Sequence, residues 1–173
     1  LNLSSYRILA FATHGLLPGD LDGLLQPALA LSSPAVTGHP DEDGLLTMSE
    51  ILAQKLDADW VVLSACNTGS GEGVGAEAVS GLGRSFFYAG ARSLLVSNWP
   101  VETSSAKTLT SSIFQNQSDN PDLSRAKALQ KSMVNMIDGP GYQDADGTTV
   151  FSYAHPIFWA PFTFIGDGGG GQP

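Results

Sequence analysis

The chain has 173 residues, and its 42% hydrophobic and 14% charged residues predict one folded domain with a sizeable core. Its formal charge of −9, from eight basic and seventeen acidic side chains, argues against nucleic acid as a partner, because the basic residues are few and scattered. No apolar run reaches the roughly twenty residues of a membrane span, no signal peptide is visible, and a lone cysteine suits a reducing compartment, so we expect a cytoplasmic protein without a membrane partner.

The N-terminal part of the chain predicts two extended segments. Residues 6–13, YRILAFAT, form an apolar run with little alternation, as expected of a strand buried on both faces of a parallel sheet. Residues 26–33 predict a second extended segment, and the stretch 34–44, with its two prolines, predicts a polar loop.

A helix is predicted to begin at Thr47. Thr47 and Glu50 have the spacing of a capping box, and Leu46 with Ile51 has that of a hydrophobic staple. The helix is expected to run to about Asp57 and to bury three side chains: Ile51, Leu52 and Leu56.

Residues 60–66, WVVLSAC, predict the next buried strand. The glycine-rich turn 67–77 leads into a helix that is expected to stop at Gly90. The apolar residues of this helix recur at three- to four-residue spacing, at Val79, Leu82, Phe86 and Phe87. A third parallel strand is predicted at 92–98.

The C-terminal part predicts helices at 103–117 and 123–137, a loop from 138 to about 156, and a strand within 158–166 despite Pro161. Strands that alternate with helices predict an α/β fold, in which a parallel sheet lies between helical layers. Right-handed crossovers bring the carboxyl ends of the strands to one edge, where ligands bind in sheets of this type.

Two residues with catalytic chemistry follow the buried strands. His14 comes directly after the first strand, and Cys66 ends the strand at 60–66. If these strands are neighbours, their ends lie about 5 Å apart, so the two side chains can meet. A free thiol with a pKa of about 8.5 is only partly ionised at neutral pH, and His14 would supply the base that activates it.

The turn after Cys66 offers backbone N–H groups for an oxyanion, and Gly15 lets a substrate carbonyl approach its own N–H closely. The two positions are about fifty residues apart, a spacing typical of caspase-type proteases. The alternative is that Cys66 is a buried structural thiol, because free cysteine is among the most buried residue types.

Five blocks of the sequence together resemble a CHAT domain, the caspase-like peptidase module that is often found beside tetratricopeptide repeats and is related to separase. These blocks, which extend over nearly the whole chain from Tyr6 to Asp167, are ATHG, DGLLTMSEI, WVVLSACNTGSG, FFYAGARSLLVSNWPVE and HPIFWAPFTFIGD.

The resemblance implies a caspase-like three-layer αβα sandwich with a mostly parallel central sheet, and a cysteine endopeptidase acting on protein or peptide substrates. It implies that Cys66 is the nucleophile, that His14 is the general acid and base, and that the Gly15 and Cys66 amides form the oxyanion hole. No metal or organic cofactor is implied. We expect the peptidase domain at 1–166, with further strands upstream in the full protein, a flexible glycine-rich tail at 167–173, and a tetratricopeptide-repeat regulatory domain or partner.

The expected substrate pocket departs from that of caspases. Ser64 stands where caspases carry glutamine, and no arginine cluster replaces it, so we do not expect specificity for aspartate. Ser64, Ser97 and Trp99 are candidate walls, although Trp99 could equally be a packing residue. Glu102 or Asp22 is a candidate partner for a basic substrate side chain.

Two other functions stay open. A catalytically silent caspase-like domain could act as a scaffold or binding module. Residues 71–76, GEGVGA, fit a dinucleotide-binding fingerprint, but Glu72 and Glu77 would repel a pyrophosphate. Of the other histidines, His39 is expected to be solvated, and His155 to orient or pack the last strand.

Overall fold

The computed structural model describes residues 3–64 and 74–168. It is a mixed α/β protein with a mostly parallel central sheet, as the sequence predicts. The chain divides into two compact units, Leu1–Pro100 and Val101–Pro173.

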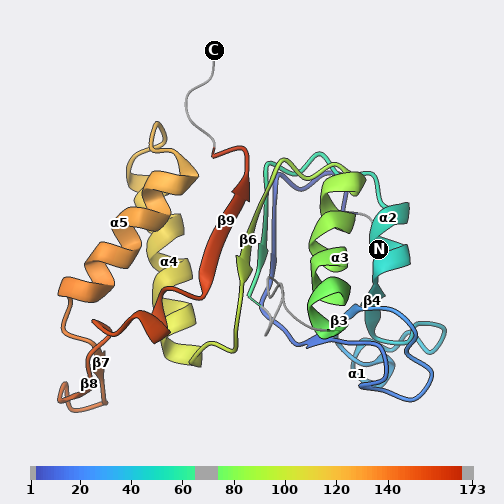
Figure 1. Ribbon diagram of the computed structural model, residues 1–173, viewed down its shortest axis with the longest axis horizontal. Helices are drawn as coiled ribbons and strands as arrows, with labels where there is room; N and C mark the ends of the chain where they lie inside the picture. The colour runs from blue at the N-terminus through green and yellow to red at the C-terminus, as the bar shows by residue number, and fades with distance from the viewer. Residues whose placement is uncertain (1–2, 65–73, 169–173) are drawn as a thin grey trace. The chain divides into compact units, whose positions relative to one another are not determined.

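The first unit combines a parallel sheet in the order β1-β5-β6, an antiparallel sheet in the order β2-β3-β4, and helices (Figure 1). Its elements are β1 (Ile8–Phe11), β2 (Gly15–Leu16), β3 (Ala28–Ala30), α1 (Pro34–Thr37), β4 (Leu45–Thr47), α2 (Met48–Ala53), β5 (Trp60–Leu63), α3 (Val74–Ala89) and β6 (Ser93–Ser97). The predicted strands at 6–13, 60–66 and 92–98 are thus confirmed as β1, β5 and β6. The expected burial of the first strand on both faces is wrong, because β1 stands at the end of the sheet order and its residues Ile8 and Ala10 are exposed. Every residue of β5 and β6 is buried, as expected of central parallel strands.

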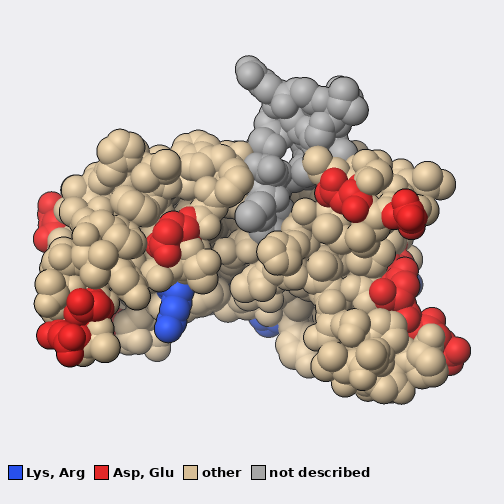
Figure 2. Space-filling view, turned by 90° about the horizontal axis from the view of Figure 1, so that it is seen from below, with Lys and Arg blue, Asp and Glu red and all other residues tan. Residues whose placement is uncertain are grey.

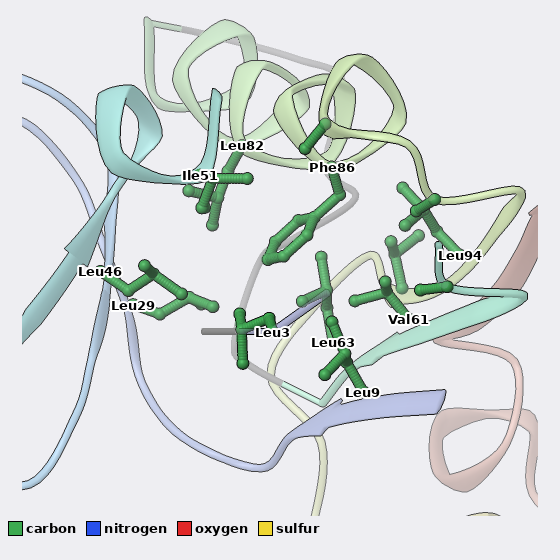
Figure 3. Close-up of a cluster of buried hydrophobic side chains, with 14 residues drawn as sticks. Leu3, Leu9, Leu29, Leu46, Ile51, Val61, Leu63, Leu82, Phe86 and Leu94 are labelled. Atoms are coloured by element: carbon green, nitrogen blue, oxygen red, sulfur yellow. The ribbon is translucent and has the colours of Figure 1, made fainter. Parts of the chain in front are cut away.

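The core of the first unit lies between the parallel strands and the helices α2 and α3. Figure 3 shows Phe86 reaching from α3 toward Leu63 of β5, with Leu82 and Ile51 beside it. The rings of Phe86 and Phe11 are 5.5 Å apart. The expected apolar face of α3 is confirmed at Leu82 and Phe86, which are buried, and at the partly buried Phe87, whereas Val79 lies outside the described side chains.

The capping box of α2 is confirmed. The Thr47 N–H donates to Glu50 Oε2 at 2.8 Å, and the Glu50 N–H donates to Thr47 Oγ1 at 3.3 Å. The helix ends at Ala53, earlier than expected, because Gln54 is extended and the Leu56 N–H donates instead to the carbonyl of Ala89 at 2.7 Å. The prediction that Leu52 is buried is wrong, since it lies off the face of the short helix that carries Ile51.

Two further local expectations are corrected. The stretch 34–44 is not loop throughout, because Pro34 stands in the first turn of α1, and Gly38, in the left-handed conformation, ends that helix by donating to the Pro34 carbonyl. The extended segment 26–33 is confirmed as β3, but it pairs with β2 and β4 in the antiparallel sheet. Strands of two or three residues are too short to show a period, and only their partners reveal them.

Charged residues stand at the amino ends of the parallel strands. Arg7 precedes β1 and contacts Asp57 at 3.1 Å and Asp59 at 2.8 Å, both of which precede β5. Arg92 precedes β6 and contacts the same two carboxylates, at 2.6 and 2.9 Å. Hydrogen bonding to Arg92, followed by the charges of Arg92 and Arg7, lowers the pKa of Asp57. These exposed pairs align the strand starts, although each contributes little to stability.

The second unit is built on two packed helices. Its elements are α4 (Thr103–Asp119), α5 (Arg125–Asp138), β7 (Tyr142–Gln143), β8 (Thr149–Phe151), a 3-10 turn (Pro156–Phe158) and β9 (Phe162–Gly166). Both predicted helices and the last strand are confirmed. Between the helices, buried Asn116 donates to Ser132 Oγ at 3.0 Å. Among the described residues, no helix has both the length and the apolar composition of a membrane span.

The predicted loop at 138–156 contains the hairpin β7–β8 instead. Phe151 stacks between Tyr142 and Phe158, with ring centroids at 5.1 and 5.3 Å. Stacking between these aromatic rings is a tertiary contact, which no local sequence pattern predicts.

Gly90 permits a close approach between the end of α3 and Leu56, in the segment that follows α2. Its φ is +116°, and a Cβ there would overlap the carbonyl of Leu56. We expect Gly90→Ala to destabilise the protein by about 2 kcal/mol or more. Gly83→Ala is the matched control, because Gly83 is helical and its added Cβ would make an ordinary contact with Leu94. Chemical denaturation measures the free energy of unfolding of both variants. Equal free energies would contradict the role given to Gly90.

Candidate active site

The carboxyl ends of the parallel strands are aligned by their register. Phe11 of β1 pairs with Leu63 of β5, and Leu63 pairs with Val96 of β6. The Ser64 N–H continues the ladder by donating to the Phe11 carbonyl at 3.0 Å. The prediction that the strands preceding His14 and Cys66 are neighbours is therefore confirmed.

His14 lies where the chain passes from the parallel sheet to the antiparallel one. Its carbonyl accepts from the Ala30 N–H at 2.9 Å, and the Thr13 hydroxyl donates to the Ala30 carbonyl. These bonds hold the backbone on both sides of His14 against β3, while the imidazole is exposed. The sequence did not predict the roles of Thr13 and Ala30, because neither residue type indicates a pairing across the antiparallel sheet.

Gly15 directs its N–H away from β3. Gly15 is opposite Leu29. In the neighbouring pair His14–Ala30, the Ala30 N–H donates a ladder hydrogen bond to the His14 carbonyl. Bonded and non-bonded pairs alternate in an antiparallel ladder, so Gly15–Leu29 is a non-bonded pair. The Gly15 N–H therefore points away from β3, at the edge of the antiparallel sheet.

Ser64 and Ser97 lie side by side at the same edge. They directly follow the registered pair Leu63–Val96, Ser64 half-buried and Ser97 buried at the end of β6. Trp99, two residues later, is 38% exposed. The structure thus brings two of the candidate pocket residues to the edge that carries His14, and leaves Trp99 partly accessible to solvent.

The two candidate acidic partners lie in different surroundings. Asp22 is exposed in a turn that is closed by a hydrogen bond from the Gly19 N–H to the Leu24 carbonyl, at 3.0 Å. Glu102 belongs to the second unit, where its carboxylate accepts the N–H groups of Ser104 and Ser105 at 2.8 and 2.7 Å and caps α4.

The other predicted residues have these positions. His39 is exposed, as expected. The His155 Nδ1 accepts the Ile157 N–H at 3.2 Å and caps the 3-10 turn that precedes β9. Cys66, residues 71–73 of the glycine motif and the tail from 169 onward lie outside the described residues.

One family match covers nearly the whole chain. The sequence profile of the CHAT domain matches residues 1–167. The chain belongs to the CHAT domain family. This CHAT domain is also 30% identical to tetratricopeptide repeat protein 28 of Mus musculus over 127 residues, which cover 73% of the chain and 5% of the relative. The same values hold for tetratricopeptide repeat protein 28 of Homo sapiens, so the domain spans a small fraction of these relatives.

The cap at Glu102 makes the stability of this domain dependent on pH. Burial alone would raise the pKa of Glu102, but hydrogen bonds from Ser104 and Ser105 together lower it below its ordinary value. A lowered folded-state pKa contributes stability above the unfolded-state pKa of about 4.3, and this stability is lost as the pH falls through the folded-state value.

We therefore expect Glu102→Ala to cost about 1 kcal/mol at pH 7, and this cost to shrink at low pH, where the wild-type carboxylate is protonated as well. Thermal unfolding across pH 3 to 7 measures the difference. Glu42→Gln, in an exposed loop, is the control for a change of charge alone. A cost that does not vary with pH would rule out the charged cap.

Proposed function

We propose that this CHAT domain is a cysteine endopeptidase with a caspase-like three-layer αβα fold, in which Cys66 and His14 form the catalytic dyad. The observation that carries the proposal is the register of β1 with β5. His14 and Cys66 each stand three residues after a member of the pair Phe11–Leu63, and this equal spacing supports a meeting of the two side chains at the carboxyl edge of the sheet.

The dyad would perform acyl transfer in two stages. His14 removes the thiol proton, and the Cys66 sulfur attacks the carbonyl carbon of the scissile peptide bond. The C–N bond breaks as His14 returns the proton to the leaving amine, and a thioester remains. His14 then deprotonates a water molecule, which attacks the thioester and releases the acid and the free thiol.

The developing oxyanion would be bound by the N–H groups of Gly15 and Cys66. The outward direction of the Gly15 N–H supports this role, because β3 does not use that donor. Because Gly15 has no Cβ, it leaves room for the substrate carbonyl.

The preferred substrate would carry a basic side chain near the cut bond. Ser64, Ser97 and Trp99 would form the walls of its pocket. Of the two candidate acidic partners, Asp22 is the more available, because the Glu102 carboxylate already accepts two amides. The net charge of −9 would also attract a basic peptide.

The similarity to tetratricopeptide repeat proteins supports a repeat domain as the regulatory partner of this module. We place the peptidase at 1–166 and the glycine-rich tail at 167–173. We also propose a cytoplasmic location, because a lone catalytic thiol is preserved in a reducing compartment.

The first test is the reactivity of the thiol. Iodoacetamide should alkylate Cys66 rapidly at pH 7, where a free thiol with a pKa of about 8.5 is mostly protonated. His14→Ala should slow alkylation about tenfold or more, because the base is gone. His39→Ala, which removes another exposed histidine, should leave the rate unchanged. Mass spectrometry of the modified cysteine over time measures these rates.

Equal rates in the wild type and in His14→Ala, or alkylation only after unfolding, would overturn the dyad and favour a buried structural thiol.

The second test separates an enzyme from a scaffold. The wild-type domain, with and without a tetratricopeptide-repeat partner segment, is incubated with a peptide library, and Cys66→Ala serves as the inactive control. We expect cleavage that is lost in Cys66→Ala and reduced in His14→Ala, with cut sites enriched in Lys or Arg. Cleavage that persists in Cys66→Ala, or no cleavage with the partner present, would favour the catalytically silent binding module.

A further inference from the structure

The second unit contains a cavity of about 630 Å³ that lies between α4, the C-terminal end of α5 and the strand β7. This volume is in the range of small-molecule sites. The lining residues are mostly polar and uncharged, and of the described residues that line it Lys107 is the basic one and none is acidic.

One face of α4 forms the long wall of the cavity. Its lining residues recur at positions i, i+3, i+4, i+7 and i+8, which is the spacing of a single helix face. They are Ser104, Lys107, Thr108, Ser111 and Ser112. A helix face at this spacing usually packs on a core through apolar side chains. Here it presents hydroxyl groups and one ammonium group to open space.

The floor and the rim of the cavity are held rigidly. Met136 and Tyr153 are buried, at 3% and 4% exposure. Burial raises the pKa of Tyr153, and a hydrogen bond with Thr108 opposes this only in part, so the phenol is neutral at physiological pH. On the rim, Gly141 has a φ of +82°, and a Cβ there would overlap the Phe151 carbonyl. The floor and the rim of the site are therefore closely packed.

Several lining groups have free hydrogen-bonding capacity. Within the described part of the chain, five lining side chains have neither a hydrogen-bond partner nor an ion pair: Lys107, Ser111, Asn135, Tyr142 and Gln143. Lys107 and Ser111 are one helical turn apart, so an ammonium group and a hydroxyl group lie together on the wall. Such a set offers one positive charge beside several neutral donors and acceptors.

We propose that this cavity binds a small polyhydroxylated anion, a sugar phosphate or a sugar acid. Lys107 pairs with the anionic group, and Ser111, Asn135 and Gln143 bind the hydroxyl groups of the ligand. The exposed part of the Tyr142 ring offers a surface for the sugar ring. This site is separate in chemistry from the proposed peptidase and does not depend on it.

The acidic character of the protein does not forbid an anion here. Figure 2 shows acidic side chains spread over the visible face, with little basic surface among them. At physiological ionic strength, charges separated by more than about 8 Å are largely screened. Lys107 then pairs locally with the anion, against the nearby carboxylate of Glu102, whose charge acts on the lining residue Tyr153. Binding is best measured at physiological ionic strength.

Calorimetry on the whole chain tests the proposal with four probes: glucose 6-phosphate, glucuronate, glucose and inorganic phosphate. We expect at least one of the two anionic sugars to bind about tenfold or more tightly than both glucose and inorganic phosphate. The anionic sugar that binds more tightly shows whether the site prefers a phosphate or a carboxylate group. Binding of neither anionic sugar overturns the proposal, and so does an affinity for glucose or inorganic phosphate equal to theirs.

Variants assign the site to this cavity. Lys107→Met should weaken binding of the anionic sugar about tenfold or more, and Lys131→Met, an exposed lysine of α5 outside the cavity, should not. Asn135→Ala should weaken the anionic sugar more than inorganic phosphate. Thermal unfolding verifies that each variant is folded, which is expected because Lys107 and Asn135 are exposed. Unchanged affinity in folded Lys107→Met overturns the assignment.

Discussion

Main-chain hydrogen bonds between β1 and β5 determine where these two strands end relative to each other, and the candidate active site depends on that alignment. Phe11 stands opposite Leu63, so both strands leave the sheet at the same level. A slip of two residues is the smallest that would keep the same side chains facing the core. It would displace one strand end by about 6.6 Å, beyond the reach of a proton transfer between their side chains. The core under Phe86 and the paired charges at the amino ends hold this register from two sides.

The antiparallel sheet β2-β3-β4 has a more specific part in the site. It takes the chain away from the parallel sheet immediately after β1, and hydrogen bonds to Ala30 on both sides of His14 fix the backbone there. The same ladder leaves the Gly15 N–H pointing outward. One short sheet thus positions an exposed imidazole and an outward-facing amide just after β1, the strand that pairs with β5, and the proposed acyl transfer depends on this arrangement.

The second unit supplies a different kind of surface. The helices α4 and α5 pack on each other, and a buried hydrogen bond between Asn116 and Ser132 fixes how they meet. The hydroxyl-rich side of α4, with Lys107, lines a cavity. The proposed peptidase edge and the proposed small-molecule site are thus formed by different elements of the chain.

The sequence by itself determined the elements whose signals are local. Apolar runs located β1, β5 and β6, the Thr47–Glu50 spacing located the start of α2, and Gly90 located the end of α3, because each signal depends on residues within one or two turns. The tertiary structure decided the short strands, the exposure of Leu52, the anchoring of His14 by Thr13 and the cavity beside α4. These features arise from pairings between residues far apart in the chain, whose free energy depends on the partner and leaves no period in the sequence.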